Sequence, residues 1–319
     1  LAQETDMTTA QAIAFPQENL IGWERALVAF LVEKERRSGS VRTVQGYSSM
    51  LQDFFGRVGK APDKVTVQEV FVWAHGKGVS GKEPSPVTIG ARMACLSSFF
   101  RFLQRMDIVH VNPCDKLERP RTSTPPARGL SAEEVRRRLA VLPDTPQGLR
   151  DRAIILTLVL TGRRRAEVFR MIAGDLSFEN GVCFYSYRGK GGKNGRREFP
   201  RPALDALRAA LTAFGKDLGA MGPSESLWPS QGAVGDRGLT SGTFYGRFRR
   251  YLEQAGLAPS GLHLLRHTAA KLRRDAGESV EDVSRFLDHS SLAVTTTYLR
   301  RLETQEDLGW GRVAEAIGL

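Results

Sequence analysis

The stretch LTLVLTGRRRAEV at residues 156–168 joins an apolar run to three consecutive arginines. The apolar run predicts a buried helix, and Thr161-Gly162 predicts the break that ends it. A new helix is expected to begin near Arg164, and Glu167, three residues later, is placed to hold or orient that arginine. Two interpretations stay open on these residues alone: the arginines either bind one defined phosphate or form a basic helix face.

The motif HLLRH at residues 263–267 carries two histidines and an arginine. Helical spacing puts His263 and Arg266 on one face, with His267 about one turn after His263. A metal site is the alternative for such a pattern. No carboxylate or cysteine stands nearby at ligand spacing, so no metal is expected here.

Residues 182–199, VCFYSYRGKGGKNGRREF, have strand-forming residues on both sides of a Gly/Asn-rich turn, which predicts a β-hairpin with Lys190 at its tip. A glycine-rich loop with lysines is also compatible with nucleotide binding, but the GxxxxGK[ST] pattern is absent. A basic hairpin tip directed toward a DNA groove agrees better with this sequence.

A histidine and a tyrosine follow near the end of the sequence. His289 lies in LDHSS, after a predicted amphipathic helix, and Tyr298 comes nine residues later on a short predicted helix. A lone tyrosine usually packs with its hydroxyl at the surface. Three of the five histidines gather in this part of the chain, which favours a chemical role.

These side chains match what cleavage of a DNA strand by a protein nucleophile requires. Guanidinium forks fit the nonbridging oxygens of a phosphodiester as those oxygens gain charge. A lysine or histidine can protonate the leaving 5′ oxygen. A tyrosine can hold the strand end as a covalent ester, without metal or ATP.

The charge of the chain agrees with a polyanionic partner: the net charge is +11 over 319 residues. Solubility alone is the alternative explanation. Three widely spaced cysteines without a CxxC pair argue against a disulfide framework and for a reducing compartment. The polar amino terminus and the lack of a ~20-residue apolar run predict a soluble protein in the cytoplasm, near the nucleoid, with no membrane partner.

The fold class expected is mainly α, with an α+β second domain. After a loose arm at 1–16, residues 17–111 predict a bundle of four or five helices, in which Thr66 and Glu69 form a capping box. Four prolines mark residues 112–129 as a linker.

Residues 130–319 predict a mixed helical domain that contains the hairpin or a small sheet. Ser131 is expected to cap its first helix. The segment 308–319 is a candidate helix that docks either on a neighbouring copy or on its own domain.

Together these motifs resemble those of the tyrosine recombinase (phage integrase) family, in the style of its Xer-like and integrase members. TGRR-x-A-E resembles the family's TG-x-R-x-x-E box, GKGGK its hairpin, HLLRH its H-x-L-R-H box and LDHSS its LGH box. The resemblance assigns six catalytic residues, with the tyrosine as nucleophile: Arg164, Lys190, His263, Arg266, His289 and Tyr298. Glu167 and His267 are candidate supporting residues beside them.

The amino-terminal half resembles the family's DNA-binding helical domain. Six basic residues outside the catalytic set are candidate DNA contacts: Arg42, Arg92, Arg163, Arg165, Arg188 and Lys193.

The motifs also depart from the family pattern. Arg163 and Arg165 replace the usual apolar neighbours of the first catalytic arginine. Asp288 replaces the common glycine before the histidine, where a carboxylate can alter the hydrogen bonding of His289. None of these changes removes a catalytic group.

The resemblance implies a site-specific recombinase that clamps double-stranded DNA and exchanges strands through a 3′-phosphotyrosyl intermediate. It further implies a homotetramer on paired sites, no cofactor, and accessory DNA-bending proteins as candidate partners. Two alternatives remain: a type IB topoisomerase-like enzyme that relaxes DNA, and a DNA-binding regulator without catalysis.

Overall fold

The computed structural model describes residues 23–78, 81–121, 129–188, 194–230 and 238–288. The chain forms two compact units that divide between Thr124 and Pro125. The described residues include no helix that is long and apolar enough to cross a membrane.

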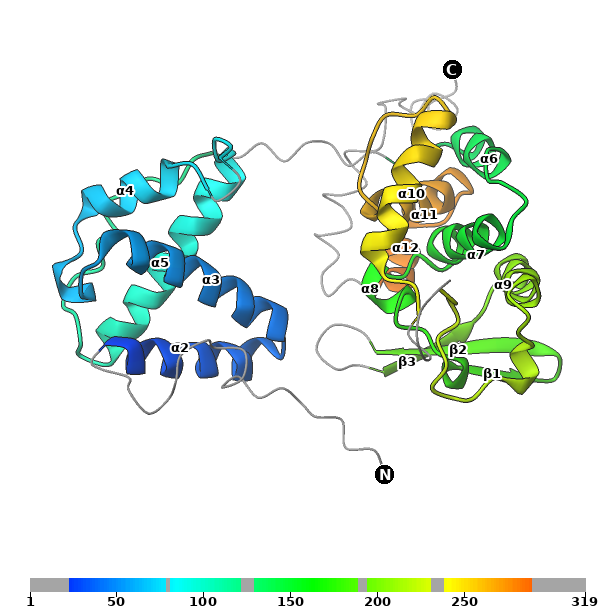
Figure 1. Cartoon of the computed structure of the whole chain (residues 1–319), viewed down its shortest axis with the longest axis horizontal. Coiled ribbons are helices and arrows are strands. Elements are labelled where there is room, and N and C mark those ends of the chain that lie inside the picture. The colour runs from blue at the N-terminus through cyan, green and yellow to red at the C-terminus, as the bar shows by residue number, and fades with distance from the viewer. Residues whose placement is uncertain (1–22, 79–80, 122–128, 189–193, 231–237, 289–319) are drawn as a thin grey trace, which may run out of the picture. The chain divides into compact units, whose positions relative to one another are not determined.

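The first unit is a helical bundle in which α5 contacts each of the other α-helices among its described residues (Figure 1). Its α-helices are α2 (Trp23–Ser38), α3 (Val41–Val58), α4 (Val67–His75) and α5 (Pro86–Arg105), with a short 3-10 turn η2 (Pro62–Lys64) before α4. The predicted capping box is confirmed, because Thr66 and Glu69 cap α4 reciprocally. Ser40 and Ser85 cap α3 and α5 through their hydroxyls alone, which accept from the backbone N–H groups of Thr43 and Thr88.

Aromatic side chains fill the core of this unit. Phe30 contacts Phe99 edge-to-face, with ring centroids 5.3 Å apart, and Phe54 contacts Trp73 at 5.2 Å. Each fully buried phenylalanine contributes roughly 1.5–3 kcal/mol by leaving water. The core also takes in Cys114, whose backbone N–H donates to the side chain of the buried Asn112. The expected linker therefore begins later than residue 112, because its first residues pack on the bundle.

The second unit is mainly helical, with a three-stranded antiparallel sheet of order β1-β2-β3 at one edge (Figure 1). Its α-helices are α6 (Ala132–Ala140), α7 (Pro146–Thr161), α8 (Arg165–Val168), α9 (Arg201–Ala213), α10 (Ser241–Gln254), α11 (His263–Asp275) and α12 (Val280–Phe286). Its strands are β1 (Leu176–Glu179), β2 (Val182–Arg188) and β3 (Asn194–Glu198), and its 3-10 turns are η3 (Ala173–Asp175) and η4 (Leu218–Ala220). Helix α7 is the centre of the unit and packs against α9 and α11.

The expected mainly helical fold class is confirmed. The hairpin is the β2–β3 pair, in which Tyr185 opposes Arg197 and Arg188 opposes Asn194. Strand β1 was not predicted individually, although its four residues, LSFE, alternate apolar and polar side chains. Ser131 caps α6 through a capping box with Glu134.

Candidate active site and nucleic-acid interface

The turn after α7 brings the first predicted arginine to the site. Gly162 ends the helix with a φ of 60°, the left-handed conformation that glycine adopts readily. A Cβ at this position would lie 2.4 Å from the ring of Phe286, so the turn packs directly on the end of α12. Two features therefore require glycine at residue 162: the positive φ and the lack of room for a Cβ.

Arg164 is held by Glu167, as its sequence spacing predicts. The Arg164 backbone N–H and its Nη1 each donate to the Glu167 carboxylate at 2.9 Å. The Arg164 side chain keeps 32% exposure, against 11% for Glu167. Arg164 is thus oriented by a carboxylate and still accessible to a phosphate.

Arg163, which was predicted from the sequence as a DNA contact, lies inside the second unit. It is buried, its Nη1 donates to Asp288, and its Nη2 donates to the carbonyl of Phe286. Its guanidinium also lies 4.2 Å from the ring centroid of Tyr187. Its guanidinium is engaged within the protein, so Arg165, the exposed neighbour of Arg164, is the better placed of the two for a DNA contact.

Helix α11 carries the second arginine and both histidines of HLLRH. Arg266 is buried and its guanidinium bridges two segments: Nη1 donates to the carbonyl of Gly162 and Nη2 to that of Leu287, both at 2.6 Å. The rings of His263 and His267 lie edge-to-face, with centroids 4.7 Å apart. Arg266 is therefore fixed against the same turn that presents Arg164.

His263 lies in a positive field. Its side chain is exposed on one side, yet partial burial and then the charge of Arg266 lower its pKa. The guanidiniums of Arg164 and Arg165 lower the same pKa further. These cations favour the neutral imidazole, which can accept a proton.

Three of the six predicted catalytic residues lie outside the described residues: Lys190, His289 and Tyr298. The predicted contact Lys193 lies outside them too, as does the segment 308–319. Arg188, the last residue of β2, is exposed at the base of the hairpin tip. Asp288, directly before His289, is described, and it binds Arg163 and Arg197.

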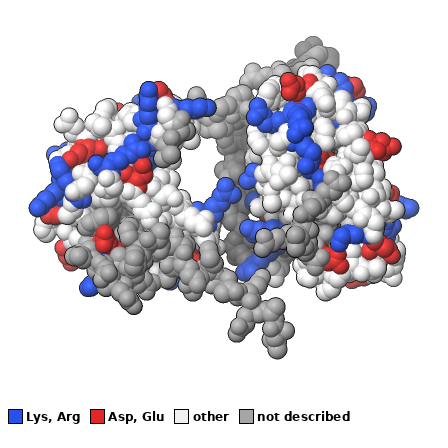
Figure 2. Space-filling view, viewed as in Figure 1, with Lys and Arg blue, Asp and Glu red and all other residues white. Residues whose placement is uncertain are grey.

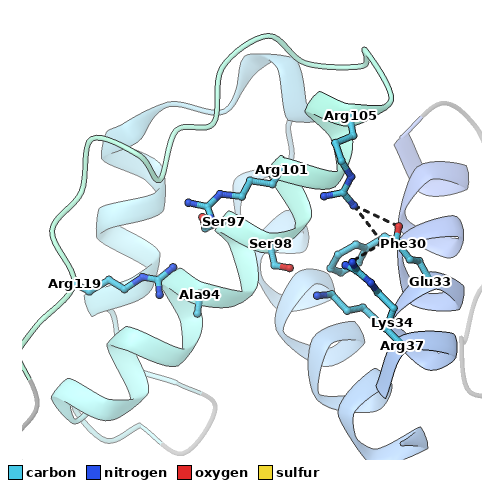
Figure 3. Close-up of a pocket in the computed structure, with 10 residues that line it drawn as sticks. All are labelled: Phe30, Glu33, Lys34, Arg37, Ala94, Ser97, Ser98, Arg101, Arg105 and Arg119. Atoms are coloured by element: carbon cyan, nitrogen blue, oxygen red, sulfur yellow. Dashed lines mark hydrogen bonds and ion pairs between the residues drawn. The ribbon is translucent and has the colours of Figure 1, made fainter. Parts of the chain in front are cut away.

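Figure 2 shows lysine and arginine side chains on both units. On the first unit, a small cavity of about 110 Å³ lies between α2 and α5 (Figure 3). Five basic side chains and one acidic side chain line it: Lys34, Arg37, Arg101, Arg105, Arg119 and Glu33. We call this group the basic pocket, and its excess of cations suits an anion such as a phosphate.

Within the basic pocket, Glu33 pairs with Arg37 at 3.3 Å and with Arg105 at 3.3 Å. Lys34 lies 4.9 Å from the ring centroid of Tyr47, and burial, followed by the charge of Arg37, lowers its pKa. These residues were not among the DNA contacts predicted from the sequence. Helical spacing was a signal for them, since Glu33 and Arg37 are one turn apart, as are Arg101 and Arg105.

Two residues of the first unit were expected to contact DNA, and their surroundings differ. Arg42 is exposed in the first turn of α3. Arg92 is partly buried, and its Nη1 donates to the carbonyls of Trp73, Ala74 and Gly76. Arg92 therefore caps the carboxyl end of α4, and its guanidinium is already engaged.

No cluster of three or more His, Cys, Asp or Glu residues that could hold a metal ion occurs in the part of the chain that the structure describes. The chemistry available at the described site is that of guanidiniums and an imidazole. Such groups bind an anionic oxygen and transfer a proton.

A comparison with known families and proteins agrees with this site. Residues 128–305, more than half of the chain, match the Phage integrase family. The chain belongs to that family, and it is a tyrosine-type site-specific recombinase.

Individual relatives support the same assignment. The chain is 29% identical to tyrosine recombinase XerC of Herpetosiphon aurantiacus over 66% of this chain and 68% of that one. It is 28% identical to tyrosine recombinase XerC of Roseiflexus castenholzii over 83% of this chain and 84% of that one. Its fold resembles that of lambda integrase, solved as a tetramer bound to a Holliday junction, with a TM-score of 0.66 and 17% identity over 96% of this chain and 84% of that chain.

Proposed function

We propose that this recombinase exchanges strands between two double-stranded DNA sites through a 3′-phosphotyrosyl intermediate. Tyr298 attacks the scissile phosphate, and its phenolic oxygen forms a bond to phosphorus while the 5′ oxygen leaves. The 5′ hydroxyl of the exchanged strand then attacks the phosphotyrosine and releases the tyrosine. One ester is exchanged for another in each step, so no ATP is consumed.

The arginines and proton carriers divide the remaining work. Arg164 and Arg266 bind the nonbridging oxygens, which gain charge as the fifth oxygen arrives. Lys190 protonates the leaving 5′ oxygen, His263 assists proton transfer at the tyrosine, and His289 donates to the phosphate. Glu167 orients Arg164, and His267 orients His263.

The observation that carries this proposal is the convergence of two motifs, TGRR and HLLRH, on one turn. Arg266 of α11 donates to the carbonyl of Gly162, two residues before Arg164. His263, one helical turn before Arg266, has its pKa lowered by burial and by both arginines. A phosphate near Arg164 would therefore meet a second guanidinium and a neutral imidazole.

DNA binding by both units accompanies this chemistry. The basic pocket of the first unit supplies phosphate contacts that position the duplex. On the second unit, Arg165 and Arg188 are the exposed candidates.

Assembly of four copies on paired sites agrees with the lambda integrase tetramer on a Holliday junction. The segment 308–319 is the candidate link between neighbouring copies. A chain that ends at residue 307 should bind DNA and fail to pair two sites. Unchanged recombination by this truncated chain would exclude the link.

Covalent capture tests the proposal. The chain is mixed with sheared DNA of its source organism, without metal or ATP. SDS then denatures the protein, and the DNA that stays attached is sequenced. The expected result is adducts at discrete sequences that vanish in Tyr298→Phe and persist in Tyr245→Phe, a matched change at an exposed tyrosine of α10.

The other outcomes are equally informative. Adducts spread evenly over the genome would point to a topoisomerase-like relaxing enzyme. DNA binding without any adduct, and unchanged in Tyr298→Phe, would point to a regulator without catalysis. Either result would overturn the proposed strand exchange.

A further inference from the structure

Two arginines from distant parts of the second unit meet on the carboxylate of Asp288. Arg163, in the turn after α7, donates to its Oδ2, and Arg197, on β3, donates to its Oδ1 at 2.7 Å. Tyr187 of β2 hydrogen-bonds the same carboxylate. We call Arg163, Arg197 and Asp288 the Asp288 cluster; none of the three has a role in the reaction proposed above.

The Asp288 cluster also satisfies the carboxyl end of α12. The last carbonyls of a helix lack partners within it and carry partial negative charge. Arg163 donates to the carbonyl of Phe286, which also accepts from Arg197 at 3.0 Å. Arg197 donates in addition to the carbonyl of Arg285 at 2.7 Å. Two cations thus fix the end of α12 against the turn after α7 and against β3.

The same two segments hold Arg266. Its guanidinium donates to the carbonyl of Gly162, the residue before Arg163, and to the carbonyl of Leu287, the residue before Asp288. A shift of either segment would move one of the two acceptors that orient this guanidinium. The Arg163–Asp288 pair joins the residues that follow these acceptors, so it fixes the spacing between them.

The backbone at residue 288 explains why the pair belongs together. Asp288 has a φ of 49°, the left-handed region where glycine is at ease and other residues are less so. A glycine at residue 288 would adopt this φ without a partner. Asp288 instead forms ion pairs with two arginines, and the buried Arg163 obtains a carboxylate as its partner. Arg163 and Asp288 therefore stabilise each other in this structure.

We propose that Arg163 and Asp288, assisted by Arg197, are positioning residues that act as one pair and set the orientation of Arg266. Arg197 lies on β3, so the cluster also ties the hairpin to the two segments that hold Arg266. The inference rests on the proposed function only in that Arg266 binds the scissile phosphate.

Three variants form the cycle that tests the pairing: Asp288→Gly, Arg163→Leu, and the double change Arg163→Leu with Asp288→Gly; Asp288→Asn is measured beside them as a further single change. The rate of adduct formation is measured in single turnover, on a duplex carrying a sequence recovered by covalent capture. Each single change should slow it about tenfold to a hundredfold, because a misplaced catalytic group costs rates of that order. The double variant, with an apolar residue and a glycine at these places, should recover most of the rate.

Noncovalent DNA affinity and urea unfolding are measured on the same proteins. The affinity should change by less than about threefold, well below the loss of rate, since no member of the cluster contacts DNA in this account. Unfolding should show coupling: the double variant loses less stability than the two single changes would together. This cycle needs no catalysis, so it tests the pairing even if the proposed function fails.

Arg247→Met is the matched control, because Arg247 also pairs with a buried aspartate of this unit, Asp151, at 2.6 Å. It should lower stability and leave the adduct rate of the folded protein unchanged. If Asp288→Asn behaves in the same way, the cluster is only structural and the positioning role is excluded. Additive losses in the double variant would exclude the pairing. An unaltered chain that forms no adduct would contradict the proposed function instead.

Discussion

Two aspartates of the second unit each gather two arginines and a tyrosine. Asp151, on α7, binds Arg150 of the same helix and Arg247 and Tyr251 of α10. Asp288, just after α12, binds the two arginines of its cluster and Tyr187. The ionic chemistry is the same at both centres, and the surroundings differ.

Asp151 lies in the middle of a helix and is fully buried, so its partners join two helices of the core. Asp288 lies at a chain reversal with 31% of its side chain exposed, and it joins three segments that each carry or adjoin a predicted catalytic residue. The first centre therefore stabilises the fold. The second sets the relative positions of a turn, a hairpin and a helix end.

The largest effect expected from this comparison is on stability at Asp151. Asp151→Asn leaves Arg150 and Arg247 without their carboxylate in the core, which should cost about 3–5 kcal/mol of unfolding free energy. Asp288→Asn should cost about 1–2 kcal/mol, because solvent reaches that carboxylate. Urea unfolding measures the free energy that each variant loses. Equal losses would show that the two centres do not differ in their contribution to stability.

The next effect separates activity from stability at Arg164. Arg164→Lys keeps the charge and loses the fork that binds two phosphate oxygens. The adduct rate should fall about 10²–10³-fold, the loss typical of one transition-state donor. Thermal unfolding should change little, since this side chain is partly exposed. If the loss of stability matched the loss of rate, Arg164 would be a residue that stabilises the fold, as Asp151 is.

Acid should affect His263 and the Asp288 cluster in different pH ranges. Burial and neighbouring arginines lower the pKa of His263 below its ordinary value of 6.5. Between the lowered pKa and 6.5, the unfolded chain binds a proton that the folded chain does not, so stability falls as the pH drops below 6.5. His263→Gln should flatten this decline in urea titrations at several pH values; an identical decline would show that His263 does not cause it.

The Asp288 pairs should survive the same acid. Burial raises the pKa of Asp288, but the hydrogen bonds from Arg163 and Tyr187 outweigh it and the net shift is below the ordinary 3.8. The stability that this carboxylate contributes is present above that value and is lost only as the pH falls through the lowered pKa. The difference in stability between the unaltered chain and Asp288→Asn should therefore be constant from pH 7 to about pH 5. A difference that shrinks in this range would contradict the ion pairs.

The smallest effect expected is at the basic pocket of the first unit. Arg105→Ala should weaken DNA binding alike on all sequences and lower the slope of log affinity against log salt by about one. Arg57→Ala, a matched change at an exposed ion pair of α3 outside the pocket, should leave the slope unchanged. Equal slopes for the two variants would remove the pocket from the DNA interface.

Sequence spacing predicted the local parts of this structure. The Thr66–Glu69 cap, the Arg164–Glu167 pair and the β2–β3 hairpin all join residues that are close in sequence, where helical or strand geometry decides which side chains meet.

The same reasoning missed pairs that only the tertiary fold brings together. Arg163 and Asp288 are 125 residues apart, and Arg105 and Glu33 are 72 residues apart. Each pair depends on how separate helices pack, and periodicity in one segment contains no information on that packing. The departures at residues 163 and 288 were visible in the sequence, but their partnership was not.

The most direct test of the account is to find the residue that carries the DNA. The covalent adduct is digested with nuclease and trypsin, and the nucleotide-bearing peptide is sequenced by mass spectrometry. The tryptic peptide 286–300, FLDHSSLAVTTTYLR, contains a single tyrosine, Tyr298. The account predicts a nucleotide on that tyrosine; a nucleotide on any other residue, or a modified peptide from another part of the chain, would contradict it.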